Sequence, residues 1–287
     1  MKYRHSYHAG NFADVHKHVA LLALLAALTR KDKGLLFLDT HAGRGAYDTS
    51  GGGAEAAAGV GRLLGSASSA APELRAYRER ISALRAALER PHLYPGSPLL
   101  AVAALRRQDR AGFLEVQGAE AHALKEALAA LAASGGERPR SVRVERGDGF
   151  AALRAWLPPA ERRGLVLIDP PYEETRADFG ALAGALEEAL ARFATGVLIA
   201  WYPIKDERSL APLYARARAL AAPVLVSELW LYPRDSRVGL NGSGLLIVNP
   251  PYRTLERMQE WLPELTACLA TGPAASSHAR MLSQSPR

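Results

Sequence analysis

The fold of this 287-residue chain is decided by residues 164–172, Gly-Leu-Val-Leu-Ile-Asp-Pro-Pro-Tyr. The run begins with continuous apolar residues, which is typical of a strand buried on both faces and hence of a parallel sheet. Pro170 and Pro171 lack backbone N–H donors, so the strand is predicted to end there. Because open α/β sheets bind ligands beyond the carboxyl ends of their strands, Asp169 and Tyr172 are predicted to face a ligand.

Similar apolar runs predict further strands at residues 35–40, 112–116, 142–145, 196–202, 224–231 and 245–249. Helical patterns at residues 119–133, 178–193 and 209–220 separate most of these runs. Such alternation predicts right-handed crossovers and a doubly wound α/β fold with a mostly parallel, seven-stranded sheet. The last two runs lie too close together for a crossover helix, so we expect an antiparallel hairpin at the sheet edge.

The chain is long enough for one large domain or two small ones. Residues 1–53 and 108–270 are interpreted as one α/β domain. Residues 54–107 are rich in Ala, Leu and Arg at helical spacing, which predicts an inserted helical subdomain after the first strand. Residues 271–287 show little periodicity and are expected to form a disordered tail.

Composition narrows the class of protein. The formal charge of +7 and the pI of about 9.7 allow a polyanionic partner without requiring one. A lone cysteine, Cys268, excludes a disulfide scaffold and a Cys-rich zinc fold. We find no apolar run of about 18 residues and no signal-peptide pattern, so we expect no membrane partner and a cytoplasmic protein.

The Asp-Pro-Pro-Tyr segment suits a planar group that carries an amine. The carbonyl oxygens of Asp169 and Pro170 are predicted to face a bound group, with the Asp169 carboxylate as an anionic acceptor and Tyr172 as an aromatic surface. Such a combination fits a nucleobase. The alternative is a strand-ending turn with a buried tyrosine.

A second loop follows the first predicted strand at residues 38–45, Leu-Asp-Thr-His-Ala-Gly-Arg-Gly. It matches neither Gly-x-Gly-x-x-Gly nor a P-loop, but it fits a loop that holds S-adenosylmethionine. Glu115, which closes the second strand, could accept the two ribose hydroxyls of a nucleoside, and Asp148 could accept an adenine amine. Taken singly, each acid also fits a surface residue or a helix cap.

The N-terminal part is dense in histidine, with His5, His8, His16 and His18 preceding His41. Their spacing matches no known metal-binding pattern, so we expect no metal. We expect these side chains to line a cleft for a cofactor and a substrate.

Together these segments resemble the ribosomal RNA large-subunit methyltransferase J family, which methylates N6 of an adenine in 23S rRNA. The resemblance rests on residues 3–18, 38–43, 94–98, 148–150, 169–173 and 241–244, in that order along the chain. It implies a Rossmann-like methyltransferase fold with a helical insertion after the first strand. It also implies S-adenosylmethionine as methyl donor, no metal, 23S rRNA as partner and, we expect, a monomer.

The resemblance also implies roles for individual residues. The implied cofactor-binding residues are His18, His41, Ser97, Glu115, Asp148, Gly149 and Asp169, with Lys17 bordering that pocket. Asp169 would also be the catalytic acceptor of the adenine amine. The implied substrate-binding residues are Tyr3, Lys17, Pro170 and Tyr172.

Two other functions remain open from sequence: a DNA adenine-N6 methyltransferase and a non-catalytic RNA-binding protein. A second signature, Asn-Pro-Pro-Tyr at residues 249–252, is interpreted as the end of an edge strand, because it follows the last predicted strand. Asp169 belongs to the fourth strand, which is predicted to lie beside the first.

Overall fold

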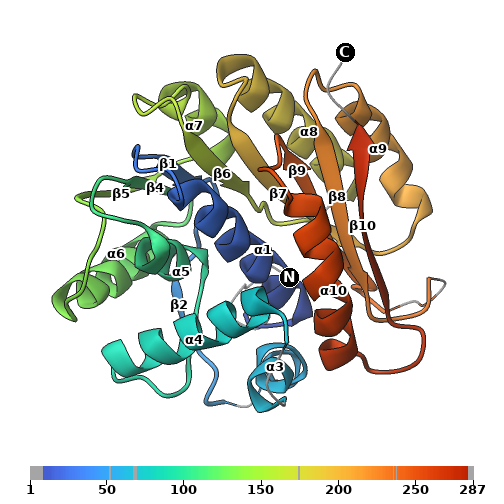
Figure 1. Ribbon diagram of the computed structural model, residues 1–287, viewed down its shortest axis with the longest axis horizontal. Coiled ribbons are helices and arrows are strands. Elements are labelled where there is room, and N and C mark those ends of the chain that lie inside the picture. Colours follow the sequence, from blue (N-terminus) through green and yellow to red (C-terminus); the bar gives the residue numbers. More distant parts are fainter. Residues whose placement is uncertain are drawn as a thin grey trace.

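The computed structural model describes residues 9–51, 53–66, 70–173, 175–234, 236 and 238–283, with residues 175 and 176 described by their backbone alone. Within these residues the central sheet has eight strands, in the order β10-β8-β9-β7-β6-β1-β4-β5 (Figure 1). The predicted doubly wound α/β fold is therefore confirmed, whereas the predicted number of seven strands is one too low.

Five neighbouring strands are parallel: β1 (Leu36–Asp39), β4 (Arg110–Glu115), β5 (Ser141–Arg146), β6 (Gly164–Ile168) and β7 (Val197–Ile204). β1 lies between β4 and β6, where Leu36 pairs with both Arg110 and Gly164. The strand order reverses at this position, and ligands bind at such a switch point in open α/β sheets.

The antiparallel part consists of β8 (Val224–Trp230), β9 (Gly242–Val248) and β10 (Ser276–Ser283). The predicted hairpin of β8 and β9 is present, but it does not form the sheet edge, because β10 pairs with β8 along its outer side. The expectation of disorder is therefore wrong for residues 276–283. The strand is mixed in polarity and only Ala279 within it is buried, so an apolar run could not reveal it.

Helices cover both faces of the sheet (Figure 1). One face carries α1 (Phe12–Thr29), α4 (Pro72–Ala87), α5 (Ser97–Ala104), α6 (Gly118–Ala133) and α10 (Thr254–Leu269). The other carries α7 (Gly149–Trp156), α8 (Thr175–Arg192) and α9 (Ala211–Arg218), preceded by the short turn η3 (Arg208–Leu210). Side chains alternate along β1 to serve both cores: Phe37 joins the first, and Leu36 and Leu38 join the second.

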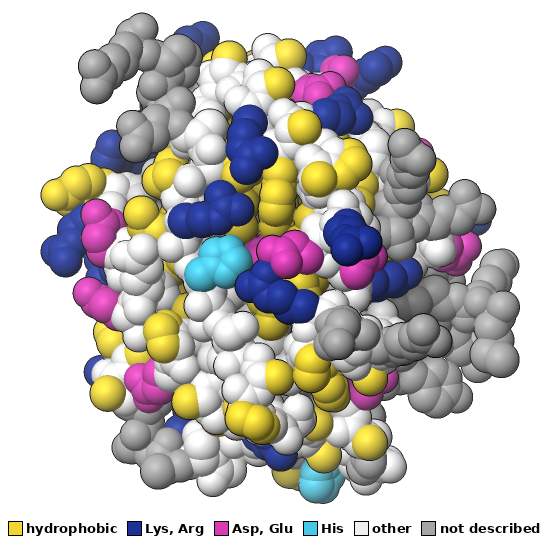
Figure 2. Space-filling model, turned by 90° about the vertical axis from the view of Figure 1, so that its right-hand side faces the viewer, with side chains coloured by type: hydrophobic (Ala, Val, Ile, Leu, Met, Phe, Trp, Pro, Cys, Tyr) yellow, Lys and Arg dark blue, Asp and Glu magenta, His cyan; other side chains and the backbone are white. Residues whose placement is uncertain are grey.

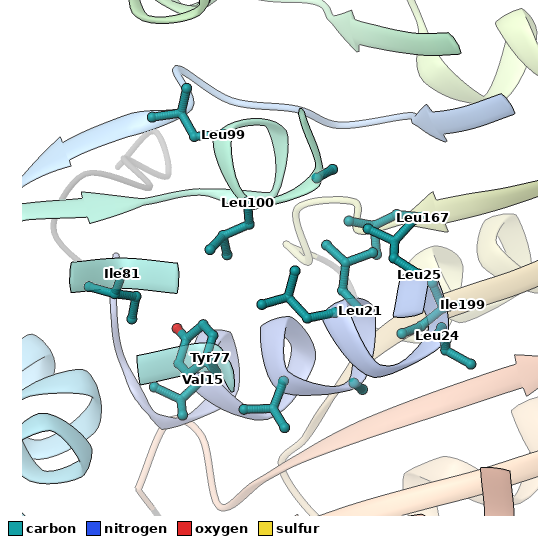
Figure 3. Close-up of a cluster of buried hydrophobic side chains, with 14 of the residues drawn as sticks. Val15, Leu21, Leu24, Leu25, Tyr77, Ile81, Leu99, Leu100, Leu167 and Ile199 are labelled. Atoms are coloured by element: carbon teal, nitrogen blue, oxygen red, sulfur yellow. The ribbon is translucent and has the colours of Figure 1, made fainter. Parts of the chain in front are cut away.

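Helix α1 is the core helix of the first face. Leu21, Leu24 and Leu25 are fully buried and meet side chains from α4, α5 and the sheet (Figure 3). By length and composition alone α1 is also apolar enough to cross a membrane, although polar residues such as Asp14 and Lys17 interrupt its apolar sequence. In the fold, however, two thirds of the helix is buried inside the protein.

The helical segment predicted at residues 54–107 contains α2 (Ala54–Ala56), η2 (Ala57–Gly61), α3 (Arg62–Gly65) and α4. The two short strands β2 (Ala46–Asp48) and β3 (Leu93–Pro95) pair at its base. Tyr77 and Ile81 of α4 join the same core as α1, so the segment packs on the same face of the sheet as α1. α5 also falls within residues 54–107, and it packs on α1 as α4 does.

Candidate active site

A cavity of about 1070 Å³ opens at the carboxyl ends of the parallel strands. Every predicted site residue that the structure describes lines this cavity: Lys17, His18, His41, Ser97, Glu115, Asp148, Gly149, Asp169, Pro170 and Tyr172. These residues come from six separate segments of the chain. Tyr3 lies outside the described residues.

Asp169 directly follows β6 and lies beside the loop that follows β1. The backbone N–H of Thr40 donates to the carbonyl of Leu167 over 3.0 Å, which joins the two strand ends. The Asp-Pro-Pro-Tyr segment and the loop of residues 38–45, here called the glycine loop, therefore lie side by side, as the sequence predicts.

The second signature lies at the end of the sheet opposite the cavity, because β9 runs antiparallel to β7. Asn249 donates from Nδ2 to the carbonyls of Ala194 and Gly196 over 2.8 and 2.9 Å. Tyr252 is 92% exposed and does not line the cavity. Asn249-Pro250-Pro251-Tyr252 thus ends a strand and does not line the cavity, as expected, but the strand is internal and not the edge strand that the sequence predicted.

A buried lysine holds the Asp169 carboxylate. Lys17 Nζ donates to Asp169 Oδ2 in a very short contact and to Asp14 Oδ1 over 2.8 Å. Asp14 in turn accepts the N–H of Gly10 over 2.9 Å. Burial opposes the charge of Lys17, but the two carboxylates outweigh it and hold the pKa of Lys17 above its usual range. The two carboxylates therefore favour the charged form of Lys17.

Backbone hydrogen bonds join the glycine loop to the Glu115 carboxylate. The N–H of Gly43 donates to Glu115 Oε2 over 2.9 Å, and the N–H of Gln117 donates to Oε1 over 2.8 Å. Gly43 has a φ of 59°, and a Cβ at this position would lie 2.4 Å from the hydroxyl of Tyr47. Only glycine fits both conditions, so the loop backbone can pass close to the carboxylate.

Asp39 is fully buried at the end of β1 and accepts two hydrogen bonds. The hydroxyl of Ser97 donates to Oδ2 over 2.7 Å, and the N–H of His41 donates to Oδ1 over 3.1 Å. Burial still dominates and raises the pKa of Asp39 to about 7. Ser97, which was predicted to contact a cofactor, thus has a partner within the protein.

This burial makes the stability of the protein depend on pH. Because the folded-state pKa of Asp39 is raised to about 7, the native state binds more protons than the unfolded state between about pH 4 and 7. Asp39 therefore lowers stability as the pH rises through that window. We expect the free energy of unfolding of the wild type to fall relative to Asp39→Asn, by up to about 1.4 kcal/mol per pH unit. Urea unfolding at several pH values measures this; equal slopes for the two proteins would contradict it.

Asp148 is the N-cap of α7. Its Oδ1 accepts the N–H groups of Phe150 and Ala151 over 2.8 and 3.2 Å, so one oxygen performs the capping role considered above. Gly149 packs against the strand end, since a Cβ there would lie 1.8 Å from the carbonyl oxygen of Thr40. The glycine therefore lets the start of α7 approach the loop after β1.

Trp201 is a cavity residue that the sequence did not indicate. It lies in the second half of β7, and its ring centroid is 5.4 Å from that of Tyr172 at an angle of 72°. The Tyr172 hydroxyl donates to the carbonyl of Trp201 over 2.6 Å, and Lys17 Nζ lies 5.8 Å from the indole centroid. Its place at the end of a predicted strand was the available signal.

The histidines have different environments. His18 contacts the Tyr94 hydroxyl over 2.7 Å, and His41 contacts the Thr40 hydroxyl over 2.8 Å; both line the cavity. Burial lowers the pKa of His41 to about 4, so this ring is neutral. His16 is fully buried and does not line the cavity, contrary to expectation. Within the described residues, no cluster of three or more His, Cys, Asp or Glu side chains could hold a metal ion.

Comparison with known proteins identifies the family of this chain. The family model described as "Ribosomal RNA large subunit methyltransferase D, RlmJ" matches residues 32–280. Ribosomal RNA large subunit methyltransferase J of Escherichia coli is 36% identical over 284 residues, which is 97% of each chain. The protein of the same name from Haemophilus influenzae is 36% identical over 94% of each chain.

A crystal structure of a Legionella pneumophila protein is also similar. It has a TM-score of 0.82 and 34% sequence identity, covering 96% of this chain and 98% of the other. The fold, the cavity at the switch point and the relatives matched over nearly the whole chain all indicate the same family. The chain is a methyltransferase and belongs to the ribosomal RNA large subunit methyltransferase J family.

Proposed function

We propose that this protein transfers a methyl group from S-adenosylmethionine to N6 of a specific adenine in 23S rRNA. The observation that carries the proposal is the convergence of Asp169, Pro170 and Tyr172 with the glycine loop and Glu115 in one cavity. Its volume of about 1070 Å³ lies just above the ~300–1,000 Å³ range for ligand sites. Such a space suits a cofactor together with a flipped base.

The residues present fit S-adenosylmethionine. Two backbone N–H groups fix the Glu115 carboxylate at the cavity wall, and a carboxylate has about four lone-pair sites. Sites therefore remain for the two hydroxyls of a ribose. His18, His41, Ser97, Asp148, Gly149 and Asp169 would border the rest of the cofactor, with Lys17 beside them. When bound, the cofactor supplies an electrophilic methyl group on a positively charged sulfur.

The protein's own part is to orient the adenine amine. The lone pair of N6 is delocalised into the ring, so the amine is a weak nucleophile. Asp169 and the carbonyl of Pro170 would accept its two N–H groups and direct the lone pair toward the methyl group. Positioning supplies much of the acceleration, and acceptors matched to the developing positive charge supply more. The proton leaves the methylated amine toward Asp169 or water.

The aromatic side chains would bind the base after it leaves its stack. Tyr172 offers a surface that offsets the cost of unstacking. We assign Tyr3 to contact with the same base, on the strength of the family resemblance. Lys17 touches Asp169 directly, so its contribution to substrate binding includes holding that carboxylate in place.

Charge is assigned a lesser part in choosing the target. Figure 2 shows Lys and Arg side chains interspersed with acidic and apolar ones on the face that it presents, without one continuous basic patch. The formal charge of +7 favours an encounter with rRNA, while the base pocket selects the adenine. We propose that the protein acts in the cytoplasm, where its rRNA substrate lies, and that it acts as a monomer.

One experiment separates this function from its alternatives. Purified protein with labelled S-adenosylmethionine should methylate 23S rRNA that lacks the modification, and digestion with mass spectrometry should find N6-methyladenosine. Equal incorporation into duplex DNA would favour a DNA methyltransferase. Binding of RNA without any methyl transfer would favour a non-catalytic RNA-binding protein, a function that membership of a methyltransferase family argues against.

A further inference from the structure

The indole of Trp201 has a place in the cavity but no part in the chemistry above. It lines the cavity beside Tyr172 and Lys17. Its exposed fraction is intermediate, so part of the ring faces the cavity. Because the rings of Trp201 and Tyr172 stand at 72°, a base stacked on one ring would meet the other at its edge.

A buried chain of hydrogen bonds fixes this indole from behind. Trp201 Nε1 donates to the hydroxyl of Ser243 over 3.0 Å, and the same hydroxyl contacts His16 Nδ1 over 3.0 Å. His16 Nε2 contacts the hydroxyl of Ser227, also over 3.0 Å. Four elements, α1, β7, β8 and β9, therefore meet behind one side chain of the cavity.

The donors and acceptors of this chain are consistent. An indole N–H only donates, so Ser243 Oγ must accept from Trp201. Its own proton is then free to be donated to His16 Nδ1, which leaves His16 Nε2–H to donate to Ser227. This arrangement needs a neutral imidazole, and burial lowers the pKa of His16 to about 3. Both ring nitrogens of this fully buried histidine therefore have partners.

We propose that Trp201 is a substrate-binding residue that packs against the flipped adenine, and that His16 and Ser243 are positioning residues that hold its indole. The inference rests on the proposed function, because it names a further wall of the same base site. Tyr172 adds to this wall through its bond to the carbonyl of Trp201, which any side chain at position 201 would preserve.

The first test is the variant Trp201→Ala in methyl transfer to 23S rRNA. Because an edge-to-face contact between aromatic groups contributes ~0.5–1.5 kcal/mol, we expect kcat/KM for the RNA to fall about two- to tenfold. The loss should appear mainly as a higher KM for RNA. The affinity for S-adenosylmethionine, measured by calorimetry without RNA, should stay within about twofold. An unchanged KM for RNA would overturn the assignment.

The second test separates positioning from general stability. Ser243→Ala removes the hydroxyl that binds both Trp201 and His16, whereas Ser227→Ala removes an equally buried hydroxyl that binds only His16. Both should lower Tm to a similar extent, but only Ser243→Ala should raise the KM for RNA. Equal effects of the two variants on KM would overturn the positioning role.

A double-mutant cycle completes the design. Trp201→Phe keeps an aromatic ring but removes the N–H, so adding Ser243→Ala to it should change the KM for RNA no further. Additive effects would show that Ser243 does not act through Trp201. If the wild type itself methylates no RNA, the proposed function fails; if it does and the variants behave as wild type, only this inference fails.

Discussion

Asp169→Asn is expected to lower kcat for methyl transfer by at least about a hundredfold while the protein remains folded. The amide keeps the shape of the carboxylate and can still accept from Lys17, but it loses the negative charge that matches the positive charge developing on N6. Single-turnover methyl transfer to rRNA measures the effect. Circular dichroism and calorimetry with S-adenosylmethionine verify that fold and cofactor binding survive.

The chain provides a matched control for this variant. Asn249→Asp creates a second Asp-Pro-Pro-Tyr segment at the end of the sheet opposite the cavity. Added to Asp169→Asn, it should restore no activity, because the sequence motif acts only where β6 meets β1. Near wild-type methyl transfer by Asp169→Asn alone would remove Asp169 from the catalytic role.

The sheet could be predicted from sequence where strands are buried on both faces. The apolar runs of β6 and β7 are continuous, whereas apolar and polar residues alternate at helical spacing in the segments around them. Helix α1 escaped prediction because the residues at its start are polar yet buried: Asp14, His16 and Lys17 face partners inside the protein, so the helix shows no clear amphipathic pattern. β2 and β3 have three residues each, which is too short for a recognisable period.

The site likewise contains residues that the sequence predicts and residues that it does not. Asp169, Glu115 and Asp148 could be predicted because each follows a strand of the parallel sheet, and parallel strands bring their carboxyl ends to one edge. The partners of these residues could not. Lys17 meets Asp169 from 152 positions away, and His16 meets Ser243 from 227 positions away. Contacts between such distant elements leave no local pattern in a single sequence.

The Lys17 ammonium is expected to be as important for stability as for activity. Lys17→Met keeps the volume of the side chain but leaves Asp14 and Asp169 without their shared cation in a site where all three side chains are at most 13% exposed. Removing one partner of a buried ion pair costs about 3–5 kcal/mol, so we expect a loss of this size at neutral pH. Urea unfolding measures it, and methyl transfer should fall together with the positioning of Asp169.

The sign of the pH dependence tests the cause. Without Lys17, burial penalises the charged forms of the two carboxylates, and acid relieves this penalty by neutralising them. The deficit of Lys17→Met relative to wild type should therefore grow as the pH rises and shrink in acid. Asp14→Asn added to Lys17→Met removes one buried charge and should recover part of the stability, yet no activity, because Asp169 remains without its cation. A deficit that is the same at every pH would instead assign the loss to packing.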